Sequence, residues 1–240
     1  MAAGDVTKTL TDELSLRLED PNETLFPIAA KLQFLNKAQI RLCNLIHPAY
    51  LTELEGVTAS PASLTPSSPA AYFTYSLATM VPAVPPASTT SGLLLGGRGV
   101  RKVKYYPSTP WTTGVWATEI SVDELKKITN PYLTYSDSYP RYLVFSNKII
   151  VYATAATTAP KVDVYYLLQP TALTASVDPT INAGLFHIIV TLAEAMLWGM
   201  DGKLERRTSA LKTAFDEIQI LNARYEPADG VGTDTRKTRS

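Results

Sequence analysis

Hydrophobic residues recur at helical spacing in the first fifty positions. Between residues 7 and 20 three leucines stand four positions apart with acidic residues between them, namely Leu10, Leu14 and Leu18. Because such steps place side chains on one face of a helix, a short helix is predicted here, and Asp20-Pro21 ends it. The same spacing from about Leu25 to Ile46 predicts a second helix, which His47-Pro48 ends or kinks.

A second pair of helices is predicted near the other end of the chain. Helical spacing runs from Leu185 to Met196, and the residues before it, Asp178-Pro179 and Asn182, are typical of a helix start. A further helix is predicted from about Lys203 to Tyr225. Gly199 and Gly202 predict a tight corner between the two, so we expect an antiparallel helical hairpin.

The middle of the chain, from about Val57 to Gln169, is rich in β-branched and aromatic residues. Strands are predicted in five runs: 71–75, 100–106, 142–145, 148–153 and 162–168. Residues Phe145 to Lys148 are typical of a hairpin turn between two of these strands.

These elements predict an α+β fold in which a helical bundle is formed by the N- and C-terminal helices and carries a central β-rich insert. In residue terms, 1–56 and 178–226 form the bundle, 57–177 form the insert, and 227–240 form a flexible C-terminal tail. One part of the insert is unusual, because no charged residue occurs from Gly56 to Gly97. It is interpreted either as surface loops around short edge strands or as an extended arm against a neighbouring subunit.

Charge and cysteine content limit the range of partners. The chain has 22 basic and 22 acidic residues, so attraction to nucleic acid or to an anionic membrane requires a local patch. The single cysteine, Cys43, is expected to be a small buried side chain of a helix. No membrane span is expected, since the longest apolar stretch, near Ile188 to Trp198, is about eleven residues long and contains Glu194. That carboxylate is expected to face a cation on the paired helix or across an oligomer interface, with Arg206 and Arg207 near in sequence.

The sequence contains no assembled motif for catalysis, metal binding or cofactor binding. His47 and His187 lack a second histidine or cysteine at ligand spacing and are interpreted as structural. The glycines from 92 to 99 lack the Gly-Lys-Ser/Thr sequence of a phosphate loop. We therefore expect a non-enzymatic protein without a cofactor.

Two basic segments are the candidate contact sites. The first combines tyrosines at 105 and 106 with four cations, Arg98, Arg101, Lys102 and Lys104, which can contact phosphates and bases, or else form a solvated strand or a protein contact. The second is the C-terminal end, which is either inert or becomes ordered in an acidic groove of a partner. Its candidate partner-binding residues are Thr233, Arg236, Lys237, Arg239 and Ser240.

Four sequence features occur in an order that resembles a known family. They are Phe34-Leu-Asn-Lys-Ala-Gln-Ile-Arg-Leu-Cys-Asn-Leu-Ile in an early helix, Val162-Asp-Val-Tyr-Tyr-Leu-Leu-Gln-Pro at the end of the β-rich region, Asp178-Pro, and Phe186-His-Ile-Ile-Val-Thr-Leu-Ala-Glu-Ala. In this order, which spans most of the chain, the sequence resembles the head-to-tail adaptor proteins of tailed bacteriophages.

The resemblance implies a structural virion protein that forms a ring, typically of twelve copies, between the portal and the tail. Its implied partners are further copies of itself, the portal protein and tail or nozzle proteins, with double-stranded DNA passing through the ring and no membrane involved. The implied location is the neck of the virion, assembled in the cytoplasm of the host bacterium. By position, the segment from about Gly232 onward would insert into the portal. A tail-nozzle or gatekeeper component, and a nucleic-acid-binding module that uses Arg98 to Tyr106, are the alternatives.

Overall fold

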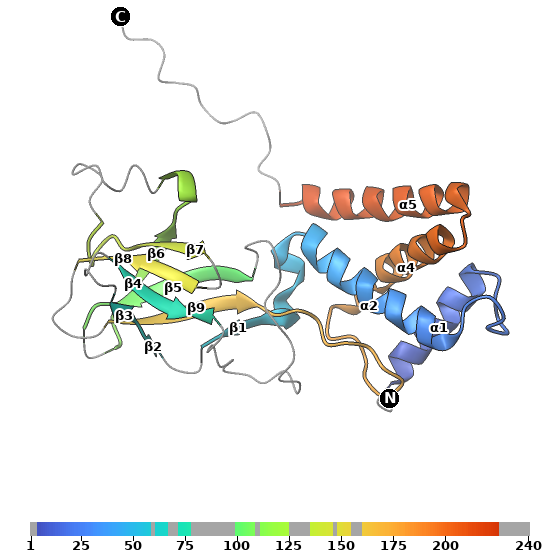
Figure 1. Cartoon of the computed structure of the whole chain (residues 1–240), viewed down its shortest axis with the longest axis horizontal. Helices are drawn as coiled ribbons and strands as arrows, with labels where there is room; N and C mark the ends of the chain where they lie inside the picture. The colour runs from blue at the N-terminus through green and yellow to red at the C-terminus, as the bar shows by residue number, and fades with distance from the viewer. Residues whose placement is uncertain are drawn as a thin grey trace, which may run out of the picture. The chain divides into compact units, whose positions relative to one another are not determined.

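The computed structural model describes residues 4–58, 61–66, 72–77, 99–108, 111–124, 135–145, 148–154 and 160–225. The chain divides into two compact units, one made of Met1–Glu53 and Pro170–Ser240 and the other of Leu54–Gln169. The first contains the long helices and the second contains the sheet (Figure 1). Both boundaries precede the predicted ones at residues 56 and 177. The second does so because the stretch after Gln169 packs on the helices: Gln39 Nε2 donates to the Thr171 carbonyl and Asn36 Nδ2 to that of Leu173.

The four predicted helices are confirmed, with ends that differ by a few residues. They are α1 (Asp5–Arg17), α2 (Ile28–Leu45), α4 (Phe186–Met200) and α5 (Leu204–Ala223). The predicted corner before α5 is also present, and Gly202 there has φ of 76°, a left-handed conformation that glycine adopts without a Cβ clash. Cys43 is buried in α2, as the sequence predicts.

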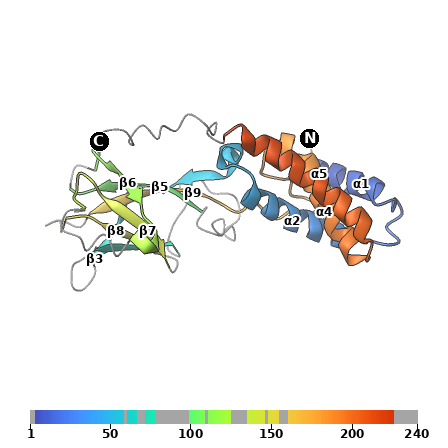
Figure 2. The ribbon, with the colours of Figure 1, turned by 90° about the horizontal axis from the view of Figure 1, so that it is seen from above.

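Helix α4 is the centre of its unit. The other three long helices each pack against it, and both ribbon views show α5 lying alongside it (Figures 1 and 2). A helix in this position needs apolar residues on most of its faces, and nine of the fifteen residues of α4 are buried. By length and composition alone the stretch Ala183–Met200 is apolar enough to cross a membrane, but 56% of it is buried inside the unit, as in a core helix.

Among the described residues, the second unit forms one large mixed sheet of nine strands. The strands are β1 (Glu55–Val57), β2 (Ala62–Ser63), β3 (Thr65–Pro66), β4 (Phe73–Ser76), β5 (Val100–Tyr106), β6 (Val115–Glu119), β7 (Arg141–Phe145), β8 (Lys148–Tyr152) and β9 (Lys161–Leu167). Their order is β1-β9-β5-β6-β7-β8-β4-β3, with β2 also paired to β9. All pairs are antiparallel except β6 with β7. The five predicted strands correspond to β4, β5, β7, β8 and β9, and Phe145 pairs with Lys148 as a hairpin requires.

A short segment pairs with strands near both ends of this sheet, so the sheet is curled. Ala62 pairs with Val162 of β9, and only three residues later Thr65 pairs with Thr74 of β4. Leu64 lies between them, and its backbone N–H donates to the Pro160 carbonyl. Because β9 and β4 are far apart in the strand order, one segment can pair with both only if the sheet is strongly curved.

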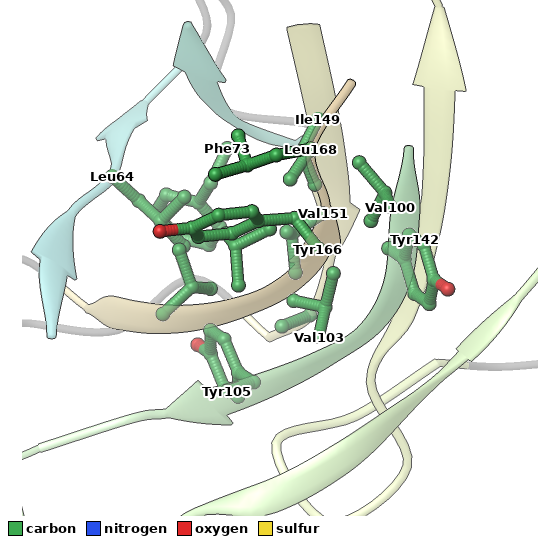
Figure 3. Close-up of a cluster of buried hydrophobic side chains, with 13 residues drawn as sticks. Leu64, Phe73, Val100, Val103, Tyr105, Tyr142, Ile149, Val151, Tyr166 and Leu168 are labelled. Carbon is green, nitrogen blue, oxygen red and sulfur yellow. The ribbon is translucent and has the colours of Figure 1, made fainter. Parts of the chain in front are cut away.

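The concave side of the curled sheet holds the core of this unit. Figure 3 shows side chains from β4, β5, β7, β8 and β9 directed toward a common centre, with Leu64 among them. Tyr105 and Tyr166 are almost completely buried there. Alternation along β5 places Val103 and Tyr105 in this core and leaves Lys102 and Lys104 for the other face.

The predicted fold class, a bundle of terminal helices carrying a β-rich insert, is therefore wrong. The curled sheet is the dominant element, and the helices pack around α4 instead of forming a bundle that holds the sheet. The sequence pattern missed β1, β2, β3 and β6, since three of these are only two or three residues long and exist because β9 or β4 lies beside them. The sequence pattern predicted five separate strands and did not predict that they belong to one continuous sheet.

The uncharged stretch from Gly56 to Gly97 is partly described. Its described residues belong largely to β1, β2, β3 and β4, and β1 and β3 end the strand order of the sheet. Residues 59–60, 67–71 and 78–97 of this stretch lie outside the described residues. The alternative of an arm against a neighbouring subunit therefore stays a prediction.

Candidate functional site

The basic segment predicted at 98–106 forms part of an exposed sheet face. Lys102 and Lys104 of β5 extend over Trp116 of β6, with their Nζ atoms 5.7 Å and 5.9 Å from the ring centroid. Lys104 pairs with Trp116 across the two strands, and the indole remains 50% exposed. The ring of Tyr165 of β9 also packs against Trp116, with ring centroids 5.2 Å apart. This group is called the lysine–tryptophan face below.

The same face continues toward the end of β5. The Tyr106 hydroxyl donates to Asp163 Oδ2 over 2.5 Å, and burial together with this carboxylate raises the pKa of Tyr106 to about 12. Gly114 permits the arrangement, because a Cβ there would lie 2.6 Å from the Tyr106 ring. Lys161 Nζ lies 4.9 Å from the centroid of Trp111. The lysine ammonium groups of this face therefore lie against aromatic rings, an arrangement that cation–π attraction stabilises. The carboxylate of Asp163 is hydrogen-bonded to Tyr106.

The predicted residues of the basic segment do not all lie on the lysine–tryptophan face. Arg101 is half-buried at a register shift between Val100 and Lys102, and Arg98 lies outside the described residues. The tyrosines also differ in role, because Tyr105 points into the core and its hydroxyl donates to Asp137. Trp116 was not predicted to belong to the segment, since β6 was missed; the β-branched and aromatic residues of Val-Trp-Ala-Thr-Glu were the available signal.

In the helical unit, Glu194 is paired with a cation, but this cation lies on α1 and not on the paired helix that the sequence analysis favours. Its Oε2 lies 3.6 Å from Arg17 Nη1 of α1, and its Oε1 accepts from Trp198 Nε1 at 3.3 Å. Arg206, one of the two suggested partners, instead pairs with Glu19 at 3.3 Å and lies over the Trp198 ring. Arg17 and Glu194 are far apart in sequence, so spacing alone could not identify this pair.

The two histidines occupy different environments. His47 Nδ1 accepts from the Ala49 N–H, and the imidazole stacks on Tyr225 with centroids 4.5 Å apart. His187 is half exposed, and its Nε2 lies 3.0 Å from Glu217 Oε2. That pair borders an apolar pocket of about 370 Å³, which is lined by Tyr50, Asn182, Gly184, Leu185, His187, Glu217, Ile220 and Leu221. Within the described ranges, no three histidine, cysteine or acidic side chains come together to hold a metal ion.

A groove lies where α2 and α5 flank α4. Its floor is formed by Ala195, Met196 and Gly199 of α4, and its volume is about 290 Å³. The α2 side contributes Phe34 and Arg41, and the α5 side contributes Arg207 and Leu211. Arg41 also lies over the ring of Phe215, at 5.5 Å, while Lys37 lies over Phe34 at 4.6 Å. We call these residues the basic groove, because its walls carry cations above an apolar floor.

The predicted partner-binding residues of the C-terminal end, Thr233, Arg236, Lys237, Arg239 and Ser240, lie outside the described residues. Comparison with protein-family models gives no match, and comparison with curated proteins gives none either.

Proposed function

We propose that this chain is a non-catalytic structural subunit whose role is to bind other polypeptides, and specifically a head-to-tail adaptor that forms a ring between the portal and the tail of a bacteriophage. Support for the general role comes from the surface of the helical unit. Support for the specific role comes from the resemblance of Phe34 to Ile46 and of Phe186 to Ala195 to such adaptors.

One observation carries the proposal: the helical unit has a complete core and still exposes large apolar side chains. Those exposed by about half or more are Leu16, Leu25, Ile28, Met200, Leu204 and Ile220. Within the same unit α4 is buried, and α5 contributes only Ala210, Ala214 and Ile218 to the interior. Large apolar side chains that stay exposed beside a complete core are available for a partner to cover.

The lysine–tryptophan face fits the same role. Its three ammonium groups provide positive charge on an exposed sheet, which suits an acidic protein surface or the phosphates of passing DNA. A nucleic-acid-binding module remains the second candidate function, and this face is the observation that favours it. Tight binding of duplex DNA by the isolated chain, falling steeply with salt, would support that second function.

The experiment for the main proposal is co-sedimentation with DNA-filled phage heads that carry a portal but no tail. We expect the full chain to sediment with the heads, and a variant that ends at Gly232 to stay in the supernatant, because the segment after it is the proposed portal-binding end. Circular dichroism of the truncated chain should match that of the full chain. Equal sedimentation of both chains would refute the role of the tail, and no sedimentation of the full chain would refute the adaptor proposal.

A further inference from the structure

The basic groove contains cations that lack acidic partners. Among the residues that the structure describes, neither Arg41 nor Arg207 takes part in an ion pair. Each guanidinium instead lies against a neighbouring surface: Arg41 over Phe215, and Arg207 against Gly199, where an added Cβ would be 3.0 Å from the Arg207 Cδ. The groove is therefore suited to a partner that brings carboxylates above an apolar contact.

Exposed residues of this composition occur on the same unit, on α1 and on the loop that joins it to α2. Asp12 and Leu16 lie four residues apart on α1, and Leu16 is 72% exposed. The loop adds exposed Glu23 and Leu25, and the first residue of α2, Ile28, is 47% exposed. We call these five residues the acidic face. It combines carboxylates with apolar side chains, as the basic groove combines arginines with an apolar floor.

The loop of the acidic face is held in a costly conformation. Glu19 and Glu23 have φ of 57° and 56°, in the left-handed region that residues other than glycine seldom adopt. The buried Asp20 carboxylate fixes the loop by accepting backbone N–H bonds from Thr24, Leu25 and Phe26. An exposed loop fixed this firmly presents Glu23 and Leu25 in one arrangement, which reduces the entropy lost when a partner binds.

We propose that the acidic face of one copy binds the basic groove of the next copy. The groove is lined by α2, α4 and α5 and contains no residue of α1, so the two surfaces are distinct parts of one unit. Two different complementary surfaces on each copy give head-to-tail association, which closes into a ring when the rotation between copies allows it. This inference rests on the proposed ring and names the surfaces that form it.

The test is charge reversal in the full chain, followed by sedimentation equilibrium. The groove variant carries Arg41→Glu and Arg207→Glu, and the face variant carries Asp12→Lys and Glu23→Lys. We expect each to weaken self-association at least about tenfold, since like charges then meet at the contact. The variant with all four substitutions restores opposite charges and is expected to recover association. Lys212→Glu, on the exposed side of α5, is the matched control and should leave association unchanged.

Recovery in the fourfold variant separates a lost contact from a damaged fold, because a misfolded chain would not recover. The pairing is refuted if the reversals change association less than twofold, if the fourfold variant fails to recover, or if the unmodified chain stays monomeric at about 1 mM. These outcomes are independent of the proposed function. If phage heads bind the chain but the charge reversals leave self-association unchanged, only the pairing is refuted. If the chains pair with each other but do not bind heads, only the adaptor proposal is refuted.

Discussion

The Lys31 ammonium lies 3.6 Å from Asp20 Oδ2, and both side chains are completely buried. Lys31 Nζ also donates to Ser15 Oγ at 2.8 Å and to the Asp20 carbonyl at 3.2 Å. The pair therefore ties α1, α2 and the loop between them together. Burial by itself would raise the pKa of Asp20, but hydrogen bonds from Phe26, Leu25 and Thr24 outweigh it and hold that pKa far below its usual range.

Replacement of Lys31 by methionine should destabilise the chain. The new side chain is similar in length but leaves Ser15 and the Asp20 carbonyl without their donor, which costs about 1 to 3 kcal/mol. Thermal unfolding followed by circular dichroism measures the change. Lys8→Met, at an exposed position of α1, is the control and should shift the melting temperature by much less. Equal shifts in the two variants would contradict a structural role for the buried pair.

Low pH should destabilise the helical unit. Asp178 accepts from the backbone N–H groups of Thr7 and Gly4, at 3.0 Å and 3.1 Å, and these bonds lower its pKa. Because the pKa values of Asp20 and Asp178 are lower in the folded chain, their stabilising effect is present above pH 4 and is lost as the pH falls below about 4. Melting temperatures measured from pH 7 to pH 2 should therefore fall at the acidic end.

The contribution of Asp178 can be isolated by replacing it with alanine. We expect Asp178→Ala to lower the melting temperature at pH 7 by about 4 °C, because the N-terminus of α1 loses its capping carboxylate. The difference from the unmodified chain should narrow as the pH approaches 2. A difference that is independent of pH would show that the charge of this carboxylate is not what stabilises α1.

High pH should destabilise the sheet unit through Tyr106. Its pKa rises to about 12 in the folded chain, so the neutral phenol is favoured there, and the resulting stability is complete below pH 10 and lost between about pH 10 and 12. Tyr106→Phe removes the ionisable group, and the stability of this variant should fall less steeply over that range. Urea unfolding at pH 8, 10 and 11, followed by tryptophan fluorescence, measures the slopes. Identical slopes would contradict the role of the Tyr106–Asp163 bond.

The ends of α2 and α5 are joined by Asn222. Its Oδ1 accepts from the His47 N–H at 2.6 Å, and its Nδ2 donates to the Leu45 carbonyl at 2.9 Å. Asn222→Ala removes both bonds and should cost about 1 to 2 kcal/mol of unfolding free energy. Gln219→Ala, on an exposed position of the same helix, should have little effect. Urea unfolding of both variants decides between a structural link and a surface contact.

Hydrophobic spacing located the four long helices, since each has a long amphipathic or apolar pattern. It located the buried face of α2 less well. Among the apolar positions that predict the helix from about Leu25 to Ile46, Ile28 is 47% exposed, whereas the polar residues Lys31 and Gln39 are buried. A prediction from hydrophobic spacing assumes that polar residues face water. Lys31 and Gln39 are buried instead, because Ser15, Asp20 and the Thr171 carbonyl supply polar partners from other parts of the chain.

The curled sheet could not be predicted in the same way. Its closure depends on Ala62 to Pro66, five residues without a strand pattern that pair with β9 on one side and with β4 on the other. For the candidate site, the sequence identified Lys102 and Lys104 but not Trp116, because the contact between them requires the pairing of β5 with β6. The basic groove was also missed, since α2 and α5 lie more than a hundred residues apart in the sequence and come together only in the folded chain.

Electron microscopy of the chain bound to tailless, portal-bearing phage heads tests the proposed function most directly. The expected result is a ring of this chain at the portal vertex, typically with twelve copies, with a central opening wide enough for double-stranded DNA. Heads whose portal vertex is unchanged after incubation with excess chain, or chain bound elsewhere on the capsid without ring symmetry, would contradict the adaptor proposal.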